Sequence, residues 1–232
     1  MTREVVIVEA VRTAVGKRKG AFRETHPVHL AAAVLDEVVT RAGLSKEQVE
    51  DVVMGCVSPI AEQGFNIGRL AVLEAGFPVT VPAVQINRMC GSGQQAIHFA
   101  CQEIRSGDMD IVIAAGVESM TKVPILSDGN DETIPVSLHE KYNFVHQGIS
   151  AEMIAEKHQI SRQELDAFSL RSHQRALDAI KRGIYQTEIL PLKGLNKEGE
   201  EIVFDQDEGP RADTSLEALA KLKTVFKEDG VV

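Results

Sequence analysis

The feature that most constrains the fold is the alternation of short apolar runs with helical patterns over the first 120 residues. Runs rich in valine and isoleucine are predicted as buried strands at residues 5–8, 51–57, 84–87 and 110–116. Helical patterns lie between them at residues 27–42, 66–75 and 92–106. Strands that alternate with helices favour an α/β fold, in which helices flank a layered mixed sheet that is largely parallel.

The pattern changes near Thr121. Residues 121–148 contain proline, glycine and a polar stretch, which predicts a long irregular connection. A helix is predicted from Ser150, and a second one begins at a capping box, Ser161–Glu164, and stops at Gly183. A polar ribbon over 197–213 and a short helix follow. We therefore expect an α/β domain over residues 1–120 and a mostly helical and loop-like domain over 121–232.

Composition limits the partners and the compartment. Twenty-five Lys and Arg against 34 Asp and Glu give a net charge of −9, which argues against nucleic acid, because phosphate binding depends on basic side chains. Three cysteines make no disulfide framework, so we expect a reducing, cytoplasmic location. No apolar run approaches the roughly 20 residues that span a bilayer, so no membrane association is expected. No cluster of Cys and His has zinc-ligand spacing, so no metal is predicted.

Cys90 is the most informative position. It lies between a predicted strand and a glycine-rich helix start, where free backbone N–H groups and the positive end of the helix dipole converge. That setting favours the nucleophilic thiolate, and the N–H groups could hold a developing oxyanion. Gly91 and Gly93 would let a substrate approach the backbone closely. The alternative interpretation is a small buried cysteine beside two packing glycines.

The same residues permit a rival hypothesis. Gly91–Ala96 fits G-x-G-x-x-A, the dinucleotide-binding fingerprint, with Asp108 or Asp110 further along. The motif follows the third predicted strand rather than the first, which weakens a nicotinamide-dependent oxidoreductase hypothesis. P-loop and serine-hydrolase motifs are absent from the sequence.

The other candidate site residues lie in patterns that indicate no specific reaction. Cys56 and Cys101 lie in apolar patterns and are predicted to pack in the core. His146 lies in a loop before a helix, where it could line a site or simply face solvent. The basic run Lys17–Lys19 is predicted to be a solvated turn, with phosphate contact as the alternative.

Five segments, in order along the chain, carry a resemblance to a known family. INRMCGSGQQAI at residues 86–97 resembles the acyl-enzyme cysteine signature of the thiolases. VRTAVGK at 11–17 is similar to the family's opening R-T-P-[IV]-G-K, with Ala14 where proline is usual. AAGVESM at 114–120 resembles the thiolase strand that leads into the loop domain. HQGISAE at 146–152 and DEGPR at 207–211 resemble segments of that loop domain.

The resemblance implies acyl transfer to and from coenzyme A, by which 3-ketoacyl-CoA is made or cleaved, with no bound cofactor and with CoA thioesters as substrates. It implies that Cys90 is the nucleophile, that Arg211 contacts the nucleotide end of CoA, and that His146 lies near the acyl and pantetheine part. Gln147 stands where short-chain members often carry methionine, which leaves the acyl length open. A homodimer or tetramer and a place in fatty acid metabolism also follow from the resemblance, with 121–232 as the CoA-binding loop domain.

The sequence also departs from the family. The G-H-P histidine and the C-x-G cysteine of the family's second half do not occur, and no cysteine follows Cys101. The chain resembles only the first part of a thiolase, so we expect little turnover from it alone and an exposed, unfinished sheet edge. A separate chain could supply the second half. The alternative hypothesis is a non-catalytic CoA-binding subunit, in which Cys90 is never acylated.

Overall fold

The computed structural model describes residues 3–232, so Met1 and Thr2 of the first predicted domain lie outside it. The chain forms two compact units, each described by itself below. Of the described residues, the first unit comprises 3–130 with Glu188–Glu208, and the second comprises Asp131–Thr187 with Gly209–Val232. The first unit thus extends ten residues beyond the predicted boundary at residue 120 and also includes the later segment Glu188–Glu208. The functional division into two domains stays a prediction.

A three-stranded parallel sheet lies at the centre of the first unit. Strand β2 (Asp51–Gly55) is the middle strand, between β3 (Val84–Ile86) and β4 (Val112–Gly116). Val53 is paired with Val84 on one side and with Ala114 on the other. Three of the four predicted strands and their parallel pairing are confirmed.

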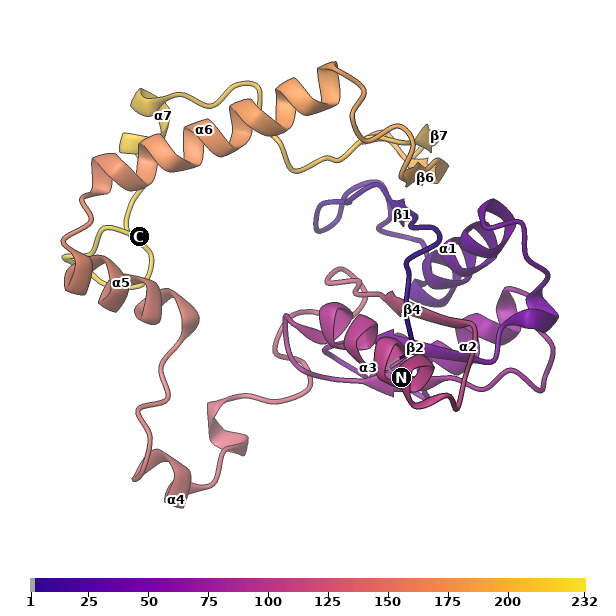
Figure 1. Cartoon of the computed structure of the whole chain (residues 1–232). Coiled ribbons are helices and arrows are strands. Elements are labelled where there is room, and N and C mark those ends of the chain that lie inside the picture. The colour runs from indigo at the N-terminus through magenta and orange to yellow at the C-terminus, as the bar shows by residue number, and fades with distance from the viewer. Residues whose placement is uncertain (1–2) are drawn as a thin grey trace. The chain divides into compact units, whose positions relative to one another are not determined.

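Helices cover both faces of this sheet (Figure 1). The helices are α1 (Pro27–Arg41), α2 (Ile67–Glu74) and α3 (Ser92–Ser106), at the three predicted places. Because side chains alternate along a strand, the two faces of β2 meet different helices. Val52 and Met54 belong to the apolar core with α1 and α2, whereas Gly55 lies directly against the first residues of α3. The result is a three-layer α/β arrangement.

Local signals set the ends of these elements. Asn66 caps the start of α2 through its side chain, which accepts a hydrogen bond from the amide of Arg69. Gly43, just after the end of α1, has a φ of 68°, in the left-handed region that commonly ends a helix. The predicted capping box at Ser45 forms, but it begins only a single 3-10 turn, Lys46–Gln48. A second such turn, Ala61–Gln63, precedes α2.

The prediction of a buried strand at residues 5–8 is wrong. Among the described residues near the N-terminus, only Arg12–Thr13 (β1) forms a ladder, parallel to Ile189–Leu190 (β5). Val6 and Ile7 are 66% and 76% exposed. The β-branched run has strand propensity, but a strand forms only where its backbone groups find a partner, and residues 3–11 form no ladder in the described chain.

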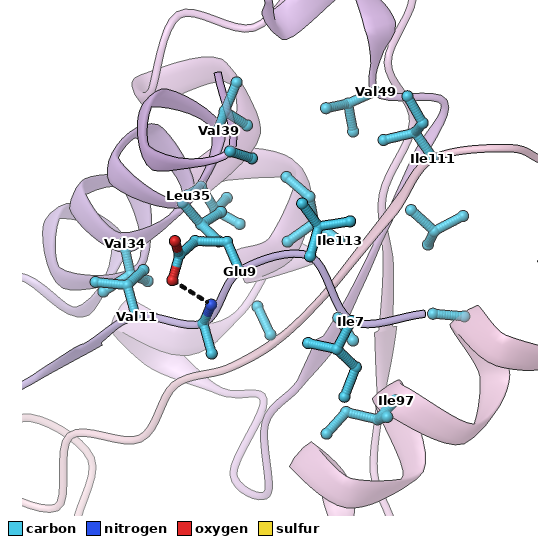
Figure 2. Close-up of a pocket in the computed structure, with 18 of the residues that line it drawn as sticks. Ile7, Glu9, Val11, Val34, Leu35, Val39, Val49, Ile97, Ile111 and Ile113 are labelled. Atoms are coloured by element: carbon cyan, nitrogen blue, oxygen red, sulfur yellow. Dashed lines mark hydrogen bonds between the residues drawn. The ribbon is translucent and has the colours of Figure 1, made fainter. Parts of the chain in front are cut away.

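An apolar cavity of about 700 Å³ separates this N-terminal segment from β4. Figure 2 shows Ile7 beside Ile97 of α3, with Leu35 and Val39 of α1 at another part of the lining. Its lining is mostly apolar and does not include Cys90. Within residues 3–232, β4 has β2 as its only ladder partner, so its outer edge is unpaired and borders this cavity.

A hairpin that the sequence did not predict completes the first unit. Strands β6 (Leu192–Leu195) and β7 (Glu201–Phe204) are antiparallel, so part of the predicted polar ribbon is a strand. The hairpin packs on the loop before α1, where the Phe204 and Phe22 rings meet edge to face at 4.9 Å. The weak signal was the apolar run Ile202–Phe204 after the turn at Lys197–Gly199.

The second unit is mostly helical, as expected. It contains a 3-10 turn (Asp131–Thr133) and the helices α4 (Val136–His139), α5 (Gln147–His158), α6 (Arg162–Lys181) and α7 (Leu216–Ala220). The Ser161 capping box is confirmed, but α5 begins three residues before the predicted Ser150. Among residues 3–232, no helix combines the length and the apolar character needed to cross a membrane.

Candidate active site

Cys90 lies in a tight turn that joins β3 to α3. It is exposed and stands two residues before the first residue of the helix. The preceding residue, Met89, has a φ of 48°, in the left-handed region that side chains rarely adopt. Ser92 fixes the turn from the helix side, because its Oγ accepts from the Arg88 amide at 2.9 Å and donates to the Met89 carbonyl at 2.6 Å. The sequence prediction of a cysteine at a strand-to-helix turn is thus met by the geometry.

The two glycines after Cys90 have different surroundings. The amide of Gly91 donates to the Arg88 carbonyl at 3.1 Å, so it is engaged within the turn. A Cβ at Gly93 would meet nothing within 4 Å, so the backbone there is open to approach. Below them, a Cβ at Gly55 would lie 2.6 Å from the carbonyl carbon of Ser92. Gly55 therefore lets the start of α3 rest directly on the end of β2.

A chain of hydrogen bonds that sequence reasoning missed supports the same turn. Asn87 Nδ2 donates to the Val57 carbonyl at 2.8 Å, and Asn87 Oδ1 accepts from the Met89 amide at 2.8 Å. On its other side, the Val57 amide donates to Glu118 Oε2 at 2.7 Å. Asn87 is the first residue after β3, and Glu118 is the second residue after β4. Site residues gather at the carboxyl ends of parallel strands, and that signal could have identified both residues.

The other two cysteines occupy different environments. Cys56 follows β2 and is buried, and this burial, with the nearby charge of Glu118, raises the pKa of its thiol to about 12. A thiol that stays protonated at neutral pH is a poor nucleophile. Cys101 lies on α3 and is half-buried. The core interpretation of Cys56 is confirmed.

His146 belongs to the second unit, where it is the N-cap of α5. Its Nδ1 accepts from the amide of Gly148 at 3.1 Å, and its ring stacks on Phe226 at 5.2 Å between centroids. Gly148 is required here, because a Cβ would lie 2.2 Å from the Phe226 ring. The exposed His146 therefore has a structural role at the helix start, and its outer edge is left available.

Arg211 also belongs to the second unit. Its amide donates to His173 Nδ1 at 3.1 Å, which ties the segment after Gly209 to α6. Its guanidinium group is exposed and lies 3.5 Å from Asp213 Oδ1. The structure thus places Cys90, Gly91 and Gly93 in one turn of the first unit and holds His146 and Arg211 in the second.

The dinucleotide hypothesis does not fit the sheet. The dinucleotide fingerprint belongs to a central strand at which the strand order reverses. Here Gly91 follows β3, which is an edge strand in the order β3-β2-β4. An exposed cysteine at a strained strand-to-helix turn, on a parallel sheet covered by helices, is instead typical of α/β proteins that use a cysteine nucleophile.

Comparison with known proteins makes this class specific. The family described as thiolase, N-terminal domain, matches residues 5–232. An acetyl-CoA acetyltransferase of Pseudomonas aeruginosa is 41% identical over 99% of this chain and 61% of its own length, and a 3-ketoacyl-CoA thiolase of a Marinomonas species is 40% identical over 96% and 57%. The crystal structure of the Bacillus anthracis acetyl-CoA acetyltransferase superposes with a TM-score of 0.87 at 37% identity and covers all of this chain and 61% of that one.

The chain belongs to the thiolase family, and it has the family's α/β fold. It spans 57–61% of the length of these relatives, in the part that corresponds to their N-terminal domain.

Proposed function

We propose that this chain carries the nucleophile of a thiolase, which transfers acyl groups to and from coenzyme A and makes or cleaves 3-ketoacyl-CoA. The observation that carries the proposal is the placement of Cys90, exposed in a left-handed turn at the start of α3. Helix N-termini favour negative charge, so the turn suits both a thiolate and the oxyanion formed when the thiolate adds to a carbonyl. The relatives named as acetyl-CoA acetyltransferases and 3-ketoacyl-CoA thiolases support the same chemistry.

The first half-reaction is a thioester exchange. The Cys90 sulfur attacks the acyl carbonyl, the bond from that carbon to the CoA sulfur breaks, and CoA leaves as its thiol after it takes up the proton from Cys90. The acyl group then stays on Cys90 as a thioester until a second substrate accepts it, which is ping-pong catalysis. Gly91 and Gly93 serve this step by allowing the acyl group to approach the backbone.

We assign CoA binding to residues 121–232, with Arg211 and His146 as contacts. The exposed guanidinium of Arg211 is suited to a phosphate of the nucleotide end, because arginine binds phosphate through several donors. His146 offers its outer ring edge beside the start of α5, where the pantetheine and acyl part would lie. Gln147, the first residue of α5, leaves the acyl length open.

The 232 residues alone should turn over slowly. They contain neither the Gly-His-Pro histidine nor the second cysteine that the thiolase resemblance implies. A nucleophile without its base loses most of its rate, because the members of a catalytic unit act together. We therefore propose that full activity needs the remaining part of a thiolase, and that the complete enzyme is a cytoplasmic homodimer or tetramer of fatty acid metabolism.

Intact-protein mass spectrometry after mixing with acetyl-CoA tests the proposal. We expect a slow gain of one acetyl group, which Cys90→Ala abolishes and Cys101→Ala does not. Addition of the C-terminal part of a thiolase should speed the gain. Binding of CoA with no acetyl transfer in the presence of that part would contradict the proposal and identify a non-catalytic CoA-binding subunit.

A further inference from the structure

We propose that Glu118 and Asn87 are positioning residues, which act through the backbone amide and carbonyl of Val57 to hold Cys90 in its reactive place. The inference rests on the proposed function in one respect, that Cys90 is the nucleophile. The strands β2, β3 and β4 end side by side, and each contributes one member of this chain of hydrogen bonds just after its last residue.

Glu118 is the end of this series of hydrogen bonds that other contacts hold in place. One carboxylate oxygen accepts from the Val57 amide at 2.7 Å, and the other accepts from Gln63 Nε2 at 2.6 Å. Gln63 is fully buried, and its own Oε1 accepts from the Ser119 amide at 2.6 Å. Glu118 is therefore fixed between two loops. Its carboxylate in turn holds the peptide group between Cys56 and Val57, and so holds the backbone of Val57, whose carbonyl belongs to the next peptide group.

Asn87 is the end of this series of hydrogen bonds that contacts the turn before Cys90. The Val57 carbonyl accepts from Asn87 Nδ2 at 2.8 Å, which sets the orientation of the amide so that its Oδ1 meets the Met89 N–H at 2.8 Å. Met89 is held at a φ of 48°. A left-handed conformation is unfavourable for a residue other than glycine, so it persists only where neighbouring contacts impose it.

The conformation of Met89 decides where Cys90 lies. Met89 directly precedes the nucleophile, so relaxation of Met89 to a negative φ would swing the Cys90 backbone away from the first turn of α3. Cys90 is already exposed, so such a movement gains no access to solvent. The movement takes the Cys90 sulfur away from the helix N-terminus. The positive end of the helix dipole there would otherwise stabilise a developing thiolate. Loss of the hydrogen-bond chain should therefore slow every reaction of Cys90.

Alkylation of the whole chain by iodoacetamide tests the inference, with rates followed at each cysteine by peptide mass spectrometry. We expect Asn87→Ala and Glu118→Ala each to slow Cys90 about two- to fivefold, the range of a lost helix-terminus interaction, while Cys101 keeps its rate. Glu118→Gln keeps an acceptor for the Val57 amide and should restore most of the rate. The double variant should be no slower than the slower single variant, because both residues act through one chain.

Gln85→Ala is the matched control. Gln85 lies on β3 two residues before Asn87, and its Oε1 accepts from the Ile67 amide at 2.9 Å, so it holds α2 rather than the turn. Equal slowing by Gln85→Ala, or a wild-type Cys90 rate in Asn87→Ala, would overturn the inference. Asn87 is exposed, so its variant stays folded and decides the matter even if Glu118→Ala unfolds. Failure of acetyl transfer from acetyl-CoA in the presence of the C-terminal part of a thiolase would contradict the proposed function instead, since alkylation needs no CoA.

Discussion

At the scale of single residues, Asp207 is the clearest case of a charge that holds distant segments together. Its carboxylate accepts two hydrogen bonds from Arg12, at 2.8 and 3.1 Å, and one from the Val15 amide at 2.7 Å. Burial by itself would raise the pKa of Asp207, but these hydrogen bonds and the charge of Arg12 outweigh it and leave the pKa below its usual 3.8. The ionised form is therefore favoured in the folded chain.

We predict that Asp207→Asn lowers the free energy of unfolding at pH 7 by about 1.5–3 kcal/mol, the usual contribution of hydrogen bonds to a charged group. Because the folded pKa is lowered, this stability is fully present above the unfolded value of 3.8 and is lost as the pH falls through the folded pKa. Urea denaturation at neutral and acid pH measures it. Asp178→Asn, which removes an exposed pair with Arg182, is the control and should change little. A deficit that persists below the folded pKa would contradict the electrostatic explanation.

At the scale of elements, the critical junction is the one between the end of β2 and the start of α3. Gly55 and Gly116 pair across the sheet, and Gly93 of α3 lies above them, 3.6 Å from the position of a Gly116 Cβ. The absence of side chains lets the helix terminus approach the sheet closely. This close approach places the Cys90 turn at the carboxyl ends of the strands.

We predict that Gly55→Ala lowers the free energy of unfolding by about 1–3 kcal/mol, the usual cost of overpacking. The new Cβ would lie 2.6 Å from a backbone carbon of Ser92, so relief requires a shift of the helix start rather than of a flexible side chain. The variant should also acquire acetyl groups at Cys90 more slowly. Chemical denaturation and mass spectrometry measure the two effects.

Gly93→Ala is the control for stability, since its Cβ would meet nothing within 4 Å. Alanine should be neutral or stabilise the helix by up to about 1 kcal/mol, because glycine is the poorer helix former. A Gly93→Ala variant as unstable as Gly55→Ala would show that the close approach at β2 is not the cause.

At the scale of the whole molecule, the first unit exposes apolar surface beside an open sheet edge. The cavity of about 700 Å³ lies between β4 and residues 3–11, and in the described chain the outer edge of β4 carries no ladder (Figure 2). Unpaired edges and large apolar patches promote association between copies.

We predict that the chain associates as its concentration rises, and that Ile7→Lys reduces this association without lowering the melting temperature. Ile7 lines the cavity and is 76% exposed, so the substitution adds a charge to the patch without removing a core side chain. Light scattering after size-exclusion chromatography measures the average mass. Val79→Lys is the matched control, because Val79 is 77% exposed and lies outside the cavity lining. An equal effect of Val79→Lys would show that net charge, not the cavity, governs association.

The sequence by itself determined the elements whose signals are local. The three helices and three of the predicted strands follow from side-chain periodicity and from caps within a few residues, and Cys90 follows from its place between two of them. These features need no knowledge of the rest of the fold, because each depends on neighbours within one turn or one strand.

Only the tertiary structure decided which segments find partners. Residues 5–8 have strand composition but pair with no strand in the described part of the chain, whereas 201–204, within the predicted polar ribbon, pair with 192–195. The support of Cys90 is equally non-local, because Val57 lies 61 residues from Glu118 and 30 from Asn87 along the chain. Backbone groups and carboxylates are satisfied by whatever the fold brings within 3 Å of them, and no local pattern records that distance.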